Sequence, residues 1–202
     1  MLNSREHFDD MFSRSDDPWH FKTRWYEARK RQLTLACLPA ARFESAYEPG
    51  CANAELSLAL ALRCDRLLIS DGSPRAVQVA RARTAHLDHV DVRQAWIPDR
   101  WPEQKFDLIV LSEVAYYLDE ASLDLLAKRV TASTLPRATV LACHWRERIE
   151  GCTLSGDDVH HRLADRLALP HLMGYSDADL RLDVWSLDFR SVAEREGFKS
   201  PR

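Results

Sequence analysis

Short apolar segments alternate with longer stretches of helical periodicity from Phe43 onward. The segment Phe106–Leu111 reads Phe-Asp-Leu-Ile-Val-Leu, which is apolar enough for a central strand covered on both faces. Strands that alternate with helices are joined by right-handed crossovers, and the result is a mostly parallel sheet with helices on both faces. Ligands bind such sheets at the carboxyl ends of the strands. The sequence therefore predicts an α/β fold with its functional residues just after the strands.

The predicted elements follow from apolar periodicity and from the positions of Pro and Gly. The strands are Phe43–Tyr47, Arg66–Ser70, Val90–Arg93, Phe106–Leu111, Thr139–Cys143 and Leu182–Leu187. The helices are Trp19–Leu38, Ala54–Arg63, Pro74–His86, Leu123–Leu135, Val159–Leu167 and Phe189–Glu196. We expect residues 1–20, which are polar, to be loose until they meet the body of the protein. No repeat or linker interrupts the chain, so we expect residues 1–202 to form one domain.

Composition excludes several classes of protein. The net charge is −3, from 28 basic and 31 acidic residues, and this disfavours a nucleic-acid-binding protein. No apolar run approaches the roughly 20 residues of a membrane span, and the polar start of the chain predicts no secretory or transit signal. The five cysteines form no metal-like spacing, which predicts reduced thiols in the cytoplasm. The sequence leaves the oligomeric state open.

A metal site is also disfavoured by the sequence. The adjacent histidines His160 and His161 suggest ligands, with Asp157 and Asp158 nearby. Neighbouring side chains on a helix, however, diverge by about 100°. We therefore expect no metal.

The turn after the first predicted strand reads Glu48-Pro49-Gly50-Cys51-Ala52-Asn53-Ala54-Glu55. Gly50 and Ala52 are small enough to let the backbone approach a ligand closely. A dinucleotide site would have three glycines here, whereas this turn has one glycine and two carboxylates, Glu48 and Glu55. An acidic residue before the turn suits a cation, such as the ammonium end of S-adenosylmethionine. The alternative is an ordinary loop with a solvated glutamate.

Asp71 ends the second predicted strand. A carboxylate at this position accepts hydrogen bonds from the ribose hydroxyls of adenosine cofactors. We place the next two residues, Gly72 and Ser73, at the same cofactor site. Asp before Gly is also a common turn former, so the alternative is a structural turn.

The segment after the third strand contains Trp96 and Ile97. Together they could form an apolar wall for an adenine ring. A surface loop that merely packs Trp96 inward is the alternative.

The fourth predicted strand is followed by Ser112-Glu113-Val114-Ala115-Tyr116-Tyr117-Leu118. We place Ser112 at the cofactor and assign Glu113 as a catalytic proton acceptor or amine-orienting group. Tyr116 and Tyr117 would line a pocket for a cation. The alternative places one of these tyrosines in the core.

The fifth predicted strand is followed by His144, Trp145 and Arg146. We assign His144 as a second candidate catalytic base, with Trp145 and Arg146 facing the substrate. The alternative is that His144 has a structural role, which is the more common role of a single loop histidine.

These features together resemble class I S-adenosylmethionine-dependent methyltransferases, and more narrowly the nodulation protein S (NodS-like) N-methyltransferase family. The resemblance covers about residues 8–190. Its motifs are Asp17-Pro18-Trp19, Trp25-Tyr26-Glu27-x-Arg29-Lys30-Arg31, Leu38-Pro39, Glu48-Pro49-Gly50-Cys51, Ser112-Glu113-Val114-x-Tyr116-Tyr117-Leu118, Cys143-His144-Trp145-Arg146 and Gly156-Asp157-x-Val159-His160.

The resemblance implies a Rossmann-like class I methyltransferase fold, with an N-terminal helical lid (residues 1–38) and an α/β core (residues 39–202). It implies S-adenosylmethionine as cofactor and an amino sugar, such as a de-N-acetylated chitooligosaccharide, as the small-molecule or oligosaccharide acceptor of the methyl group. In that case Arg29 would bind the methionine carboxylate, although it could instead form an exposed ion pair with Glu27 or Asp16. Trp25 and Tyr26 would contact the acceptor.

Two departures from the family pattern leave other functions open. The cofactor turn has Asn53 or Ala54 where a glycine is usual, and Gln94 or Trp96 stands near the place of an adenine-facing acid. Asn tolerates the left-handed backbone better than most residues. The alternatives are a catalytically degenerate binding protein with this fold and an NAD(P)-dependent oxidoreductase on a related fold.

Overall fold

The computed structural model describes residues 5–200, so the first four and last two residues of the predicted domain lie outside it. A seven-stranded sheet has the order β3-β2-β1-β4-β5-β7-β6. Its strands are β1 (Phe43–Pro49), β2 (Cys64–Asp71), β3 (Val90–Gln94), β4 (Phe106–Ser112), β5 (Thr134–Trp145), β6 (His171–Ser176) and β7 (Leu180–Ser186). The pairs from β3 to β5 are parallel, whereas β7 is antiparallel to both neighbours. The strand order reverses between β1 and β4, which is where such sheets bind ligands.

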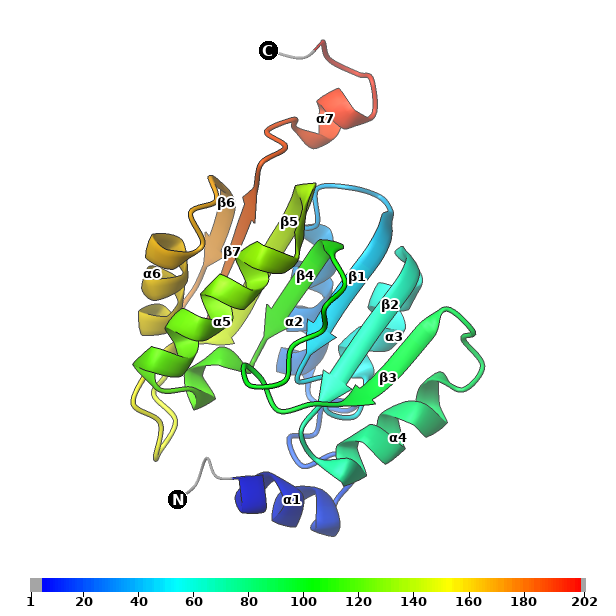
Figure 1. Ribbon diagram of the computed structural model, residues 1–202, viewed down its shortest axis with the longest axis vertical. Coiled ribbons are helices and arrows are strands. Elements are labelled where there is room, and N and C mark those ends of the chain that lie inside the picture. The colour runs from blue at the N-terminus through cyan, green and yellow to red at the C-terminus, as the bar shows by residue number, and fades with distance from the viewer. Residues whose placement is uncertain (1–4, 201–202) are drawn as a thin grey trace.

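Helices cover both faces of this sheet. They are α1 (Arg5–Arg14), α2 (Trp25–Ala36), α3 (Glu55–Ala61), α4 (Pro74–Thr84), the 3₁₀ turn η1 (Ala115–Tyr117), α5 (Glu120–Ser133), α6 (Gly156–Arg166) and α7 (Val192–Arg195). In Figure 1, α5 and α6 lie in front of the sheet and α2 and α3 behind it. Alternate residues of β4 belong to different cores, with Leu108 and Val110 in one and Ile109 and Leu111 in the other. The predicted Rossmann-like fold with a mostly parallel sheet is confirmed.

Three elements differ from the sequence-based expectation. Residues 5–14, expected to be loose, form α1, and α2 begins at Trp25 rather than Trp19. The Asp17 carboxylate accepts hydrogen bonds from the backbone N–H groups of Phe21 and Lys22, and this folds the intervening residues into a turn. The edge strand β6 is missing from the predicted strands, because its residues are all exposed or half-buried and therefore show little apolar pattern.

None of the helices between residues 5 and 200 has the length and apolar character that a bilayer crossing requires.

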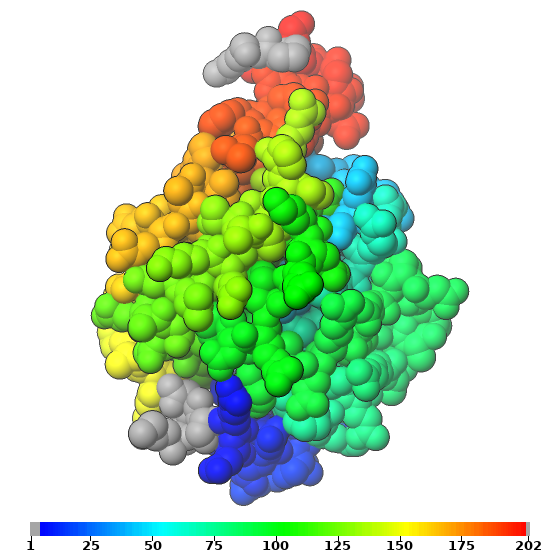
Figure 2. Space-filling model, viewed as in Figure 1, coloured from blue at the N-terminus to red at the C-terminus, as the bar shows by residue number. Residues whose placement is uncertain are grey.

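The N-terminal helix α1 lies at the edge of the sheet where the parallel strands end (Figure 1). The space-filling view shows this dark blue segment packed against the base of the molecule (Figure 2). Phe12 is buried and its ring lies 5.6 Å from that of Trp19, while the ring of Phe8 stands edge-on to Tyr117 at 4.9 Å. The segment therefore covers the carboxyl ends of the strands with aromatic side chains.

The turn between β1 and α3 has a left-handed backbone at three alternate positions. Gly50 has φ +73°, Ala52 φ +48° and Ala54 φ +63°. A Cβ atom at Gly50 would lie 2.8 Å from Val114 Cγ2, so this position requires glycine for space as well as for conformation. Ala52 and Ala54 also adopt this left-handed backbone, which costs any residue with a Cβ atom roughly 1–2 kcal/mol in free energy. Of the two positions where the family's glycine is expected, Asn53 or Ala54, it is Ala54 that has the left-handed backbone.

Replacing the strained alanine at position 52 by glycine is expected to stabilise the protein. Ala52→Gly relieves the left-handed strain but increases the entropy of the unfolded chain, and the net gain is about 0.5–1 kcal/mol. Urea unfolding followed by circular dichroism measures this gain. The matched control is Ala59→Gly within α3, which is expected to lose about 1 kcal/mol. A loss of stability at both positions would contradict strain at Ala52.

Candidate active site

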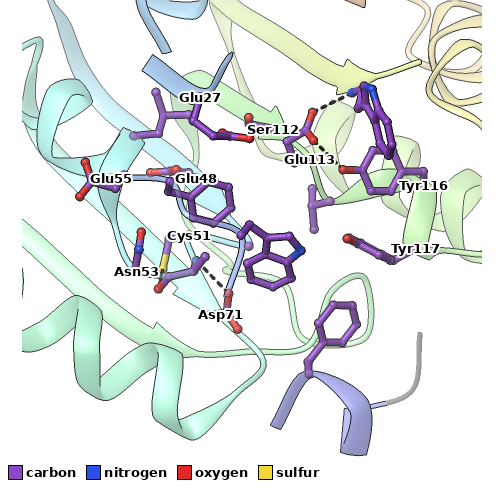
Figure 3. Close-up of a pocket in the computed structure, with 18 of the residues that line it drawn as sticks. Glu27, Glu48, Cys51, Asn53, Glu55, Asp71, Ser112, Glu113, Tyr116 and Tyr117 are labelled. Atoms are coloured by element: carbon purple, nitrogen blue, oxygen red, sulfur yellow. Dashed lines mark hydrogen bonds between the residues drawn. The ribbon is translucent and has the colours of Figure 1, made fainter. Parts of the chain in front are cut away.

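A cavity of about 710 Å³ lies at the carboxyl edge of the sheet, between the strand ends and the N-terminal helices. Most of the residues singled out in the sequence line it: Tyr26, Glu48, Gly50, Ala52, Asp71, Gly72, Trp96, Ile97, Ser112, Glu113, Tyr116, Tyr117 and Trp145. Figure 3 shows Glu48, Asn53 and Asp71 on one side of this cavity and Glu113, Tyr116 and Tyr117 on the other. Residues from six separate segments of the chain therefore meet in one place.

Glu48, near the end of β1, is a buried carboxyl group whose charge is not balanced by a neighbour. Its side chain is 3% exposed, and within the described residues Oε2 has no hydrogen-bond partner. Burial raises the pKa of Glu48 to about 8, and the negative charge of Asp71 adds to this rise. The other carboxylate of the turn, Glu55, pairs with Arg83 instead. Glu48 is thus available to a cationic ligand.

Asp71, at the end of β2, connects the turn after β1 to the turn after β2. Its Oδ2 accepts a hydrogen bond of 3.0 Å from the Ala52 N–H, and its Oδ1 accepts one of 2.9 Å from the Ser73 N–H. Burial raises the pKa of Asp71 to about 6, although these hydrogen bonds oppose the rise. Each carboxylate oxygen can accept a second hydrogen bond, so Asp71 can still receive hydroxyl donors from a ligand.

The Trp96 side chain both packs inward and lines the cavity, so the two interpretations of this residue are compatible. A Cβ atom on Gly72 would lie 2.1 Å from the indole, which therefore rests directly on the glycine backbone. The Arg5 guanidinium lies 5.4 Å from the centre of the same ring. Only glycine at position 72 allows this contact.

Glu113 follows β4 in a strained left-handed conformation, with φ +56°. Its Oε1 accepts a hydrogen bond of 2.8 Å from the Trp145 N–H, and its Oε2 accepts one of 2.7 Å from the Tyr116 hydroxyl (Figure 3). The Lys30 ammonium lies 3.4 Å from Oε2. Two hydrogen bonds and one ion pair thus fix the carboxylate at the cavity wall.

The sequence analysis assigned no role to Glu27 and Lys30, which are buried residues of α2 that line the cavity. Their side chains form an ion pair with Nζ and Oε2 2.8 Å apart. Lys30 also lies 5.2 Å from the centre of the Tyr26 ring. Glu27, Lys30 and Thr34 are the buried residues of α2, and their spacing of three and four residues could have identified this polar face.

Three predicted ligand-contacting residues do not line the cavity because other partners hold them or because they face solvent. Arg29 forms an ion pair of 2.6 Å with Asp177, so its expected contact with a cofactor carboxylate is not supported. Arg146 pairs with Asp157 at 3.0 Å. Trp25 is 69% exposed at the start of α2.

Ser73 is also absent from the cavity wall. The side chain is fully buried, and it is the backbone N–H that contributes, by bonding to Asp71.

His144 lies behind the cavity wall and is fully buried. Its Nε2 accepts a hydrogen bond of 3.2 Å from the Ala115 N–H, so its Nδ1 carries the proton and donates to His160 Nε2 at 3.1 Å. His160 Nδ1 in turn donates to Asp183 at 2.7 Å. Burial holds the pKa of His144 well below its usual value. His144 is therefore neutral, with both ring nitrogens occupied, and supports the η1 turn from behind.

The cavity is lined by acidic and aromatic side chains and by four basic ones, Arg5, Arg24, Lys30 and Arg31. Among residues 5–200, no group of three or more His, Cys, Asp or Glu side chains is placed to hold a metal ion.

Curated proteins and solved structures are similar to this chain. The chain is 33% identical over 109 residues to Nodulation protein S of Sinorhizobium fredii, a match that covers 54% of this chain and 50% of that protein. The chain thus spans about half the length of this curated relative.

Two solved structures extend the similarity over most of the chain. A putative methyltransferase from Pseudomonas syringae is 48% identical, with a TM-score of 0.73 over 81% of this chain and 99% of the other. N-methyltransferase NodS from Bradyrhizobium japonicum, in complex with S-adenosyl-L-homocysteine, is 23% identical, with a TM-score of 0.83 over 91% of this chain and 98% of the other. The second likeness shows the fold.

The family model described as Nodulation protein S (NodS) matches residues 7–134. The matched region contains α1, α2, the β1–α3 turn, the end of β2 and the segment from Ser112 to Tyr117, and so includes most of the cavity wall. Because this match covers more than half of the sequence, the chain belongs to the Nodulation protein S family.

Proposed function

We propose that this chain is an S-adenosylmethionine-dependent methyltransferase that methylates an amine nitrogen. The observation that carries the proposal is the buried carboxyl group of Glu48, whose Oε2 has no hydrogen-bond partner among residues 5–200, beside Asp71 at the ends of two neighbouring strands. Together they suit a ligand with a cationic group at one end and ribose hydroxyls nearby. The similarity to a putative methyltransferase and to a NodS complex with S-adenosyl-L-homocysteine supports this assignment.

The residues present fit such a cofactor. Glu48 would bind its ammonium group, and Asp71 would accept hydrogen bonds from its ribose. The backbone at Gly50 and Ala52 leaves room for close approach, while Ser112 borders the same part of the cavity. Trp96 and Ile97 provide an apolar wall for the adenine.

The cofactor carboxylate needs a cation other than Arg29, which is bound to Asp177. Arg24 and Arg31 line the cavity from the same region of the chain and are the replacement candidates.

When bound, S-adenosylmethionine supplies an activated methyl group, so the chain has mainly to hold the acceptor nitrogen in line with it. Tyr26, Tyr116, Tyr117 and Trp145 form an aromatic wall suited to a cationic amine or to the C–H faces of a sugar. Glu113 orients the acceptor from a fixed position. His144 contributes indirectly, because its hydrogen bond to Ala115 positions the turn that carries these groups. Of the N-terminal segment expected to form a lid, residues 5–38 are described, and several of them line this cavity.

The acceptor that fits best is an amino sugar, such as a de-N-acetylated chitooligosaccharide. The aromatic wall and the nearby carboxylates of Glu27 and Glu113 suit a sugar that carries an ammonium group. A dinucleotide oxidoreductase is disfavoured, because Glu48 and Asp71 would repel a pyrophosphate.

The deciding experiment is an intact-mass assay with glucosamine oligomers of two to five units and isotopically labelled S-adenosylmethionine. We expect a labelled methyl group on the glucosamine oligomers and none on fully N-acetylated oligomers of the same length. Binding of S-adenosylhomocysteine without methylation of any amine would instead indicate a catalytically degenerate member of the family. Stabilisation by NADH alone in a thermal-shift assay would favour the oxidoreductase.

Binding of S-adenosylhomocysteine is expected to strengthen as the pH rises towards 8. Below pH 8 the Glu48 carboxyl is largely protonated in the free protein, whereas the ligand's ammonium group favours the carboxylate, so binding releases a proton. The dissociation constant should therefore fall by up to tenfold between pH 7 and 8, which lies at least one unit above the pKa of Asp71, about 6. Calorimetry in two buffers of different ionisation enthalpy measures both the affinity and the proton release.

The Glu48→Gln variant provides the control for this titration. It should bind more weakly at pH 8 and release no proton, whereas Glu103→Gln, an exposed site, should behave as the wild type. The same pH dependence in Glu48→Gln and wild type would remove Glu48 from the cofactor site.

The Asp71→Asn variant is expected to weaken S-adenosylhomocysteine binding at least tenfold. A hydrogen bond to a buried charged group contributes about 1.5–3 kcal/mol, and the amide keeps only one acceptor oxygen. Fluorescence or calorimetric titration measures the affinity, with Asp91→Asn, an exposed residue paired with Arg93, as the matched control. An unchanged affinity would show that Asp71 only braces the turns.

A further inference from the structure

The acceptor side of the cavity contains an unbalanced negative charge. Glu27 and Glu113 both lie beside Lys30, at 2.8 Å and 3.4 Å from its ammonium nitrogen. The two carboxylates and the one ammonium in direct contact leave a local charge of −1. Of these groups Glu27 and Lys30 are buried, while Arg31 lies farther along the cavity wall, and buried charges are costly without a partner. An incoming cation would balance this cluster, and an amine acceptor is a cation until it loses a proton.

Methylation requires that proton to leave, because only the unprotonated nitrogen has a lone pair with which to form a bond. Three of the nearby groups are poorly placed to take it. Lys30 is held in its charged form: burial would lower its pKa, but the two carboxylates raise it above the usual value. His144 is fully buried, and both of its nitrogens are occupied. Glu113 already accepts hydrogen bonds at both oxygens.

Glu27 differs from these three groups. Lys30 contacts its Oε2, whereas Oε1 has no hydrogen-bond or ion-pair partner within residues 5–200. The side chain is buried but belongs to the cavity wall, and Figure 3 shows it across the cavity from Asp71, close to Glu113. Burial raises the pKa of Glu27 above that of an ordinary glutamate, although Lys30 opposes the rise. The charged groups that affect it are Lys30 and Arg31 on α2 and Glu113 from the end of β4.

We propose that Glu27 is the catalytic residue that binds the acceptor's ammonium group and takes its proton, with Lys30 as the positioning residue that holds Glu27 and Glu113 on either side. This inference rests on the proposed function and adds a base to it. One proton moves from the ammonium nitrogen to Glu27 Oε1, and the nitrogen keeps the lone pair that forms the new N–C bond. After the product leaves, the protonated Glu27 releases its proton to water.

The test is the Glu27→Gln variant, which retains the shape of the side chain but not its charge or basicity. The probe is the glucosamine tetramer, titrated calorimetrically into protein saturated with S-adenosylhomocysteine. We expect the variant to bind this tetramer at least tenfold more weakly than the wild type. The N-acetylglucosamine tetramer, which has no ammonium group, should bind equally to both proteins. The affinity for S-adenosylhomocysteine should be unchanged.

Turnover provides a second readout that a merely structural role would not reproduce. With S-adenosylmethionine and the glucosamine tetramer, Glu27→Gln should reduce kcat by about a hundredfold at pH 7. The deficit should narrow to within tenfold at pH 9, where the amine is already neutral and needs no base. Glu27→Asp should recover tetramer binding to within threefold of the wild type, since it keeps the negative charge. Glu103→Gln is the control for removing an exposed carboxylate.

These outcomes separate the inference from the function on which it rests. If the wild type methylates the glucosamine tetramer and Glu27→Gln matches its affinity and pH profile, the role of Glu27 is wrong and the methyltransferase assignment stands. A wild-type protein that neither binds nor methylates this tetramer would overturn both the acceptor class and the inference. Should the Gln variant fail to fold, Glu27→Asp decides, because loss of tetramer binding despite a retained carboxylate would contradict the proposal.

Discussion

The hydrogen bonds of the Asp71 carboxylate hold the cavity open. One oxygen binds the turn after β1 through Ala52, and the other binds the turn after β2 through Ser73. The backbone N–H groups of Gly50 and Cys51 also donate to Ser70 O, at 2.7 and 2.9 Å, so the two strand ends are joined directly. This bracing holds Ala52 and Ala54 in a backbone that alanine otherwise avoids. The turn therefore keeps its shape without the family's usual glycine, although the strained alanines reduce the stability of the fold.

Charge, more than shape, defines what the cavity can bind. Glu48 lies on one side of it and Glu27 with Glu113 on another, while Lys30 compensates for one of these carboxylates. Such a cavity disfavours phosphates and favours ligands that carry a cation at each of these places. A methyl donor with an ammonium group would place its cation beside Glu48, and an amine acceptor would place its own beside Glu27 and Glu113. The same arrangement of charges therefore supports the proposed cofactor and the proposed acceptor together.

The sequence predicted the sheet and the position of Glu48 and Asp71 at one edge of it, because both follow from strand periodicity. Glu48 and Asp71 were found from their positions at strand ends, and parallel pairing of β1 with β2 necessarily brings those ends together. The acceptor side was harder to predict, because α2 buries Glu27, Lys30 and Thr34, whereas periodicity rules expect an apolar buried face.

His144 illustrates a second limit of the sequence analysis. The residue type suggested a catalytic base, but burial is set by tertiary packing and could not be inferred from a single position. Arg29 is similar, since its partner Asp177 is distant in the sequence and becomes a neighbour only through the β6–β7 edge.

The attachment of α1 suits a lid over this cavity. Its ion pair between Arg5 and Asp99 involves side chains more than 60% exposed, and such pairs contribute roughly 0–1 kcal/mol. Phe12 is buried and Phe8 packs edge-on against Tyr117, so aromatic contacts hold α1 more firmly than this ion pair does. The helix α2 contributes buried charged groups instead, Glu27 and Lys30. The N-terminal segment thus covers the cavity with aromatic rings from α1 and lines it with an ion pair from α2.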